Sequence, residues 1–429
     1  MKKVFLSVSL VLFCMAAVFA GGSKQQSTGG KTTLTVWDFK YAEEVTGKAF
    51  REMDALFMQE NPDIIINHAA QAESTFYDLL LQTFSAKGNV DVVISHPGER
   101  SWAFTDFLEV LDPYITAERS QYSKLALEAC SPTRNPDRDT LMLPLTAQGI
   151  GIYYNKANFR KAGLDPDKAP AAWNDFLAAC EALKNANIPP VIMGNVTTAT
   201  SVNWLYRTLL VKLYGDRSAG FLTGSANFTD PEYRQATTMI KELFTRGYVN
   251  ADNASLSLFM DAIDLFKSGQ GGFFIGLNSD IAHWKDFGES LGYNNVGYFP
   301  GPIPQGSAFP DAQVNQGAGL GMSVMNYRPN KDAAVKYIKF YTSGKGAKIF
   351  LDASGAIVPN TTVPMDTGNN LLSTVLNEMN VHGGLDYSGF IPAGMSADYD
   401  SLNYLFFVSG EISIDSYIRQ LQDLIQSYR

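Results

Sequence analysis

The chain has 429 residues, 45% of them hydrophobic, and a formal net charge of −9 at pH 7. A chain of this length exceeds the size at which one hydrophobic core keeps growing, which favours two lobes. Its apolar content excludes intrinsic disorder. The acidic balance argues against nucleic acid and anionic membrane surfaces as partners.

The N-terminus has the pattern of a secretory signal peptide. Two lysines precede an apolar run over residues 4–18, and Ala20 supplies the small residue of a cleavage site before Gly21. The run is shorter than the roughly 20 residues that span a bilayer, which disfavours an uncleaved anchor. We therefore expect residues 1–20 to be a signal peptide and 21–31 a flexible tract. The mature protein would then be periplasmic or extracellular, with a net charge of −11 once the two lysines are removed.

The cysteines leave two questions open. Cys14 lies in the apolar run and allows a second interpretation, in which this thiol is lipidated and anchors the protein to the membrane. The bulky Phe13 disfavours this interpretation, because lipoprotein sites have a small residue directly before the cysteine. Cys130 and Cys180 remain after cleavage and could pair in an oxidising compartment. Two thiols do not make a disulfide framework, and Cys180 falls on the apolar face of its predicted helix. We therefore expect two buried free thiols.

The first part of the mature chain alternates strands with helices. A predicted helix through Phe50, Met53 and Phe57 ends at Asn61, because Pro62 follows it. The other predicted elements are strands at 33–37, 64–67 and 91–94 and a helix at about 74–86. Two of these strands are continuous apolar runs, which is typical of a parallel sheet covered on both faces.

The alternation continues with longer helices. The pattern predicts strands at 149–154, 272–275 and 319–325 and helices over 173–183, 204–214, 232–244 and 259–266. A Pro- and Gly-rich segment precedes the strand at 319–325. Asn330 is the expected N-cap of a further amphipathic helix, which ends at Gly344.

Eight segments follow one another in a recognisable order and spacing along most of the mature chain. They are TLTVWDF, ENPDIIINH, DVVIS, YNKANFRKAGLD, AWNDFLAACEALK, LFKSGQGGFFIG, GAGLGMSV and NKDAAVKYIKFYTSGKG. In this order and spacing they resemble bacterial extracellular solute-binding proteins that feed sugars to ABC importers, the group that includes maltose-binding protein. The part of the chain after about residue 361 is the least recognisable.

The resemblance implies an α/β, two-lobe periplasmic-binding-protein fold. Each lobe would be a mostly parallel sheet flanked by helices, discontinuous in sequence. Mapped onto this chain, lobe 1 would comprise 32–143 plus 318–360, and lobe 2 would comprise 145–314 plus 365–429. The hinge crossings would lie near 143–146, 314–318 and 360–365.

A search for catalytic motifs finds none. The sequence has no GxxxxGK[ST] loop, HExxH, GxSxG or CxxC motif, and its four histidines lack metal-ligand spacing. We therefore expect no enzyme, cofactor or metal site. Because carboxylates are plentiful, a glycosidase pair remains an alternative that inspection leaves open.

Aromatic, amide and charged residues stand where the predicted strands end, which is where ligands bind in open α/β sheets. The candidate ligand residues are Trp37, Asp38, Lys40, Glu73, Ser74, Ser95, His96, Gln148, Asn195, Trp204, Asn278 and Ser279. The two tryptophans are also compatible with core positions, and Ser74 with a helix cap.

These side chains suit a sugar, whose apolar ring face stacks on aromatic rings while its hydroxyls pair with amides and carboxylates. We expect a monomeric protein that captures a mono- or oligosaccharide between two lobes and delivers it to the membrane subunits of an ABC permease. The alternatives are a secreted carbohydrate-active enzyme, or a binding protein for a polyamine, an anion or a chelated metal.

Two positions depart from maltose-type proteins. Gly276 is followed by Leu277 and Asn278 where those proteins often have a tryptophan, and Ser95 and His96 stand where they often have an aromatic residue. The departures disfavour a maltodextrin and favour a smaller or differently held saccharide.

Overall fold

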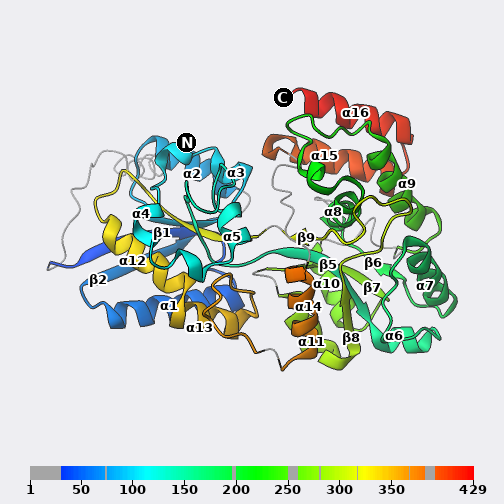
Figure 1. Ribbon diagram of the computed structural model, residues 1–429, viewed down its shortest axis with the longest axis horizontal. Coiled ribbons are helices and arrows are strands. Elements are labelled where there is room, and N and C mark those ends of the chain that lie inside the picture. The colour runs from blue at the N-terminus through cyan, green and yellow to red at the C-terminus, as the bar shows by residue number, and fades with distance from the viewer. Residues whose placement is uncertain are drawn as a thin grey trace, which may run out of the picture.

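The computed structural model arranges the chain as two lobes, each built around its own sheet, with helices on both sides (Figure 1). The structure describes residues 30–72, 75–195, 200–249, 259–279, 282–315, 317–366, 368–381 and 392–429. Within these ranges, no helix has the length and apolar character that a bilayer crossing requires.

The sheet of the first lobe has the order β2-β1-β3-β10-β4. Its strands are β1 (Thr32–Asp38), β2 (Ile64–Ala70), β3 (Val92–Ser95), β4 (Leu143–Pro144) and β10 (Gly321–Val324). β1 pairs in parallel with β2 and β3, whereas β10 runs antiparallel to β3 and β4. β10 joins this sheet after the chain has built most of the second lobe, so the first lobe is discontinuous in sequence.

Helices cover both faces of this sheet. They are α1 (Val45–Glu60), α2 (Phe76–Ser85), α3 (Glu99–Trp102), α4 (Asp112–Ile115), α5 (Lys124–Ala129), α12 (Lys331–Thr342) and α13 (Gly344–Ser354). The repeat of Phe50, Met53 and Phe57 forms the buried face of α1, as the spacing predicts. Asn330 occupies the N-cap position of α12, but its side chain makes no capping bond, so that part of the prediction is wrong.

The sheet of the second lobe is mostly antiparallel, which corrects the expectation of a mostly parallel sheet there. Its strands are β5 (Gly149–Asn155), β6 (Val191–Ile192), β7 (Phe273–Asn278), β8 (Val296–Phe299) and β9 (Val314–Asn315). β5 pairs antiparallel with β7, β8 and β9, and the described parallel pair of this second sheet is β6–β7. The register reflects this direction, because Gly149 at the start of β5 lies opposite Asn278 and Asn315 at the ends of β7 and β9. β5 leaves the crossing between the lobes, and β7 and β9 return to it.

Helices from the middle and the end of the chain complete the second lobe, some packed against this sheet and others, including those at the C-terminus, against neighbouring helices. They are α6 (Lys156–Lys161), α7 (Trp173–Asn185), α8 (Thr200–Tyr214), α9 (Pro231–Thr245), α10 (Phe259–Lys267), α11 (His283–Leu291), α14 (Asn370–Val381), α15 (Ser396–Asn403) and α16 (Ile414–Gln426). One core contains buried residues of α8, α9 and α16, where the Tyr417 hydroxyl lies 3.4 Å from that of Tyr206. The C-terminal helices therefore belong to the second lobe in space (Figure 1).

The two described cysteines are buried and free, which confirms the preferred prediction. Cys130 packs in a small cluster of the first lobe, and Cys180 lies in the main core of the second. Burial raises the pKa of both thiols, which keeps them protonated and inert.

Candidate ligand-binding site

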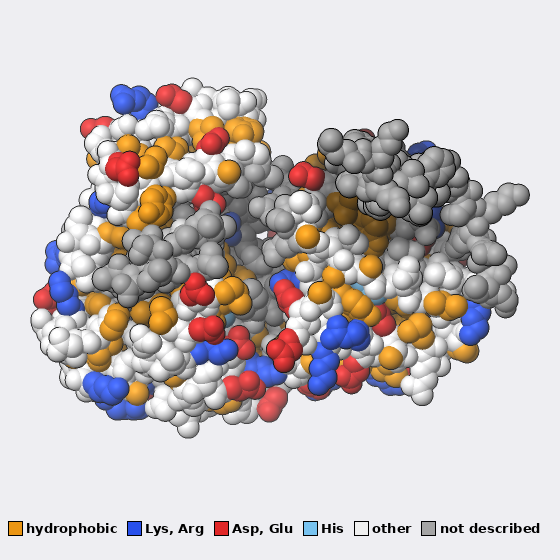
Figure 2. Space-filling view, turned by 180° about the vertical axis from the view of Figure 1, so that it is seen from behind, with side chains coloured by type: hydrophobic (Ala, Val, Ile, Leu, Met, Phe, Trp, Pro, Cys, Tyr) orange, Lys and Arg blue, Asp and Glu red, His pale blue; other side chains and the backbone are white. Residues whose placement is uncertain are grey.

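The molecule is hollowed between its two lobes, as the space-filling view shows (Figure 2). On one side of this gap lie α2, α3 and α5 of the first lobe, and α8 and α15 of the second lobe face them (Figure 1). The candidate residues lie on the first lobe, at the connection between the lobes and on the second lobe.

On the first lobe, His96 is held in a fixed position at the end of β3. Its Nδ1 lies 2.9 Å from the Tyr77 hydroxyl, and its backbone N–H donates to the same oxygen at 3.1 Å. The imidazole also stacks on Phe39, with ring centroids 5.0 Å apart. Its neighbour Ser95 is buried and bonded to the Ser101 hydroxyl, so of this predicted pair only His96 is partly exposed.

Asp38 is buried below the surface of the gap. Its Oδ2 lies 3.6 Å from His68 Nε2, an ion pair rather than a hydrogen bond, and its Oδ1 accepts the Tyr41 backbone N–H at 3.0 Å. Both side chains of the ion pair are 1% exposed. This arrangement makes Asp38 a support for the loop that follows β1 rather than a surface for a ligand.

The other first-lobe candidates have mixed surroundings. Lys40 is largely buried, and its Nζ donates to Glu43 at 3.0 Å. Trp37 is half-buried against the lobe core. Glu73 and Ser74 lie outside the described residues.

Three predicted residues meet where the chain crosses between the lobes. Ser279 Oγ donates to Gln148 Oε1 at 3.4 Å, and neighbouring Asn278 accepts a hydrogen bond from the Tyr153 hydroxyl. Asn278 and Ser279 are fully buried, while Gln148 is partly exposed. Ser279 Oγ also lies 3.5 Å from the hydroxyl of Thr146, which the prediction missed. These side chains form the floor between the lobes.

The two remaining candidates lie on the second lobe. Asn195 is 3% exposed, and its Oδ1 accepts the Val202 backbone N–H at 3.2 Å, which holds the start of α8. Trp204 is half-buried on α8, edge-on to Phe259 with ring centroids 4.7 Å apart. Neither is a fully exposed platform.

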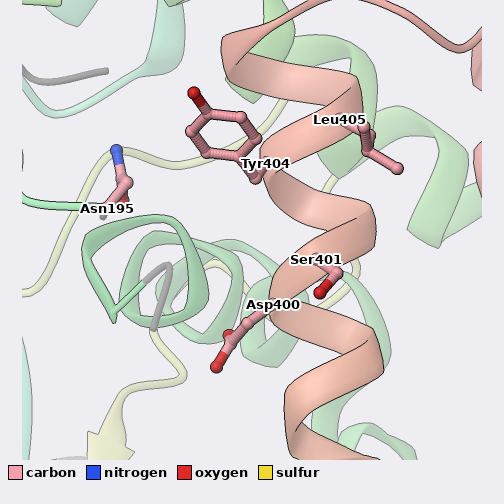
Figure 3. Close-up of a pocket in the computed structure, with 5 residues that line it drawn as sticks. All are labelled: Asn195, Asp400, Ser401, Tyr404 and Leu405. Atoms are coloured by element: carbon pink, nitrogen blue, oxygen red, sulfur yellow. The ribbon is translucent and has the colours of Figure 1, made fainter. Parts of the chain in front are cut away.

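A cavity of about 350 Å³ opens beside these residues, with α15 and the π-helical segment Tyr404–Val408 that continues it as one wall (Figure 3). Asn195, Asp400, Ser401, Tyr404 and Leu405 line it. Figure 3 shows Asp400 and Tyr404 pointing to the same side of their helix, toward Asn195. Tyr404 is 41% exposed, so its ring is accessible to a ligand.

Asp400 is the acidic residue among the described residues that line this cavity. Burial raises the pKa of its carboxyl to about 7, and a hydrogen bond from the Asn203 amide at 3.3 Å opposes that shift. The cavity thus combines a carboxylate, an amide, a hydroxyl and an aromatic ring, the groups that recognise a polyhydroxylated molecule.

Asp400 and Tyr404 were not among the residues predicted from the sequence. They belong to the C-terminal segment, which carries no strand-end pattern and the weakest family resemblance. Their spacing of four residues, which places two side chains on one face of a helix, was the available signal.

The described residues contain no cluster of His, Cys, Asp and Glu arranged to hold a metal ion.

Known proteins are similar to this chain in sequence or in fold. The multiple sugar-binding protein of Streptococcus mutans serotype c is 22% identical over 347 residues, which cover 75% of this chain and 76% of that protein. A chitin oligosaccharide binding protein superposes with a TM-score of 0.77 at 18% identity, covering 93% of this chain and 99% of the other. Maltose-bound T. maritima MalE3 gives 0.73 at 16% identity, with coverages of 93% and 100%.

These structural similarities confirm the predicted two-lobe fold. The sequence itself matches the family model described as bacterial extracellular solute-binding protein over residues 41–348, more than half of the chain. This protein therefore belongs to the bacterial extracellular solute-binding protein family.

Proposed function

We propose that this protein captures a saccharide in the gap between its lobes and delivers it to an ABC-type membrane permease, without catalysing a reaction. The observation that carries the proposal is the lining of the gap. On the first lobe, the His96 imidazole is stacked on Phe39, and at the crossing the Gln148 amide is partly exposed. On the second lobe, the Asp400 carboxyl lies beside the exposed ring of Tyr404. The names of several similar proteins, which refer to sugars, support the choice of ligand.

The chemistry of these groups fits a sugar. The accessible ring of Tyr404 can receive the apolar face of a pyranose, while Asp400, Asn195 and Gln148 can pair with its hydroxyls. A hydrogen bond to a charged group contributes roughly 1.5–3 kcal/mol. A few such bonds and one stacked ring reach micromolar affinity, about −8 kcal/mol, after ordering costs.

Capture would proceed by hinge closure. The segments 32–143 plus 318–360 would form one moving body, and 145–314 plus 365–429 the other, with crossings near 143–146, 314–318 and 360–365. Contacts from both lobes favour the closed form, and the difference in affinity between the forms sets the shift. The partly exposed candidates His96, Gln148 and Trp204 would contact the sugar, supported by the buried ones.

The protein would work outside the cytoplasm as a monomer. The signal-peptide pattern at residues 1–20 supports export, and the family description supports an extracellular solute as ligand. Anchoring through a lipidated Cys14 is the alternative, and the intact mass of the exported protein distinguishes the two.

Calorimetry against maltose, raffinose, xylobiose and diacetylchitobiose tests the proposal. We expect micromolar binding of at least one sugar, and Tyr404→Ala should weaken it by about tenfold because the stacked ring is lost. Tyr428→Ala is the matched control, since Tyr428 is 40% exposed and does not line the cavity. Hydrolysis of nitrophenyl glycosides would instead support an enzyme, and no binding by any sugar would contradict the proposal.

A further inference from the structure

The Asp400 carboxyl group has an incomplete set of partners. The Asn203 amide, 3.3 Å away, donates to Oδ1, and no described Lys or Arg forms an ion pair with Asp400. The group lies in the wall of the cavity, neither fully exposed nor fully buried. A partly buried carboxyl is less well solvated than an exposed one, which disfavours its ionised form.

The described groups around Asp400 do not form an ion pair with its carboxylate. On the same helix, Tyr399 is buried, and burial raises the pKa of its hydroxyl. The positive charge of Arg207 on α8 partly opposes that rise in the Tyr399 pKa. From α16, the Tyr417 hydroxyl donates to Asn403 at 2.5 Å. Asn195 faces the cavity from the loop before α8 as an uncharged amide. Among these groups, Asp400 is the one whose protonation changes near neutral pH.

We propose that Asp400 accepts hydrogen bonds from two neighbouring hydroxyl groups of the saccharide, and that capture of the sugar therefore releases a proton. This inference rests on the proposed function. In the free protein, partial burial favours the protonated form of this carboxyl and raises its pKa to about 7. Sugar hydroxyls that replace water stabilise the ionised form, because a carboxylate is an acceptor with room for several donors. The proton lost from the carboxyl passes to the buffer.

The geometry favours a neutral hydroxyl pair over a cationic ligand. Asn195 and Ser401 line the same cavity and can both donate and accept, and Tyr404 offers a ring face. Adjacent hydroxyls of one sugar ring reach the two oxygens of one carboxylate. A sugar with either hydroxyl removed or methylated should therefore bind more weakly.

The test is calorimetry at pH 7 with the sugar that binds best among maltose, raffinose, xylobiose and diacetylchitobiose. The binding heats in phosphate and in Tris differ by the number of protons released multiplied by the difference between the ionisation enthalpies of the two buffers, and we expect release of between zero and one proton. Affinity should rise by about tenfold or more between pH 5.5 and 8.5, since ionisation of Asp400 is complete only at the upper end.

Variants separate Asp400 from other groups. Asp400→Asn should abolish proton release and the rise in affinity with pH, whereas Asp398→Asn, on an exposed position of the same helix, should retain both. Histidine ordinarily titrates in this range, so His96→Gln shows how much of the pH dependence comes from the opposite lobe. The wild-type heats test the proposal even if a variant fails to fold.

The outcomes are distinguishable. Binding with equal heats in both buffers, proton uptake, or an unchanged pH profile in Asp400→Asn would overturn this inference and leave the proposed function intact. Binding restricted to amino sugars would overturn the assignment of a hydroxyl pair. Absence of binding by every sugar would overturn the proposed function and, with it, this inference.

Discussion

A buried polar cluster at the end of β1 shows how single residues support the candidate site. Asp54 on α1 accepts hydrogen bonds from the hydroxyls of Tyr337 and Tyr341, each at 2.6 Å, and lies 3.0 Å from His68 Nδ1. His68 in turn faces Asp38, whose other oxygen holds the loop after β1. The cluster thus links α1, α12 and the loop that leads into the gap.

Removing the charge of Asp54 should destabilise the fold. Asp54→Asn would leave His68 and the two tyrosine hydroxyls with a weaker acceptor in a buried place, which costs about 3 kcal/mol of unfolding free energy. Urea unfolding measures this loss. Glu52→Gln, on the exposed side of the same helix, should change stability by less than about 0.5 kcal/mol. Equal midpoints for the two variants would show that the cluster contributes little.

The same cluster gives stability a dependence on pH. Burial opposes the charged form of His68, but the carboxylates of Asp38 and Asp54 outweigh it and raise the pKa above 6.5. The folded state therefore binds the proton more tightly than the unfolded state. The stabilisation is fully present below about pH 6.5 and is lost as pH rises through the folded pKa.

A comparison of wild type with His68→Gln isolates this effect. The difference in unfolding free energy between the two proteins should shrink as pH rises from 6 to 9. Chemical denaturation at several pH values measures it. A difference that stays constant or grows with pH would contradict a raised pKa for His68.

At the scale of elements, local patterns predicted the position of most helices and strands but not every strand direction. The apolar repeat of α1 and the apolar runs of β2 and β3 depend only on neighbouring residues, so the sequence reveals them. The antiparallel pairing of β5 depends on where β7 and β9 return to the crossing, which no local pattern encodes.

The candidate site divides in the same way. The strand end before Ser279 and the crossing before Gln148 were predictable from the sequence, and the structure brings these two residues together with Asn278. Which side chains face the gap depends on packing, so Asp38 and Ser95 proved to be buried supports. Asp400 and Tyr404 come from a helix that reaches the cavity only through the tertiary fold.

The crossing between the lobes should tolerate little added volume at Gly319. A Cβ there would lie 2.2 Å from Ser279 Oγ and 2.7 Å from Gln148 Oε1, so both floor side chains must move. We expect Gly319→Ala to weaken sugar binding at least fivefold and to cost about 1–3 kcal/mol of stability. Calorimetry and urea unfolding measure the two effects.

Gly368→Ala is the matched control for this substitution. Its added Cβ would meet only the exposed side chain of Asp366, at 3.0 Å, away from the floor. The control should bind sugar as the wild type does. Wild-type affinity in Gly319→Ala would show that the floor geometry is not part of the binding site.

At the scale of the whole molecule, the two lobes are separate packed units joined by few chain crossings. A hydrogen bond from the Leu320 backbone N–H to Thr146 Oγ1, at 2.9 Å, holds the connection between β4 and β5 in place. The Ala147 backbone N–H donates to the carbonyl of Ile357 at 2.7 Å. Each lobe has its own core, so relative motion can concentrate at these crossings while the cores stay intact.

Small-angle X-ray scattering with and without the bound sugar tests the central claim, capture by closure of two lobes, most directly. We predict that saturating sugar reduces the radius of gyration, and that Tyr404→Ala requires more sugar to reach the same compact form. A sugar that binds by calorimetry and leaves the scattering profile unchanged would contradict capture by closure.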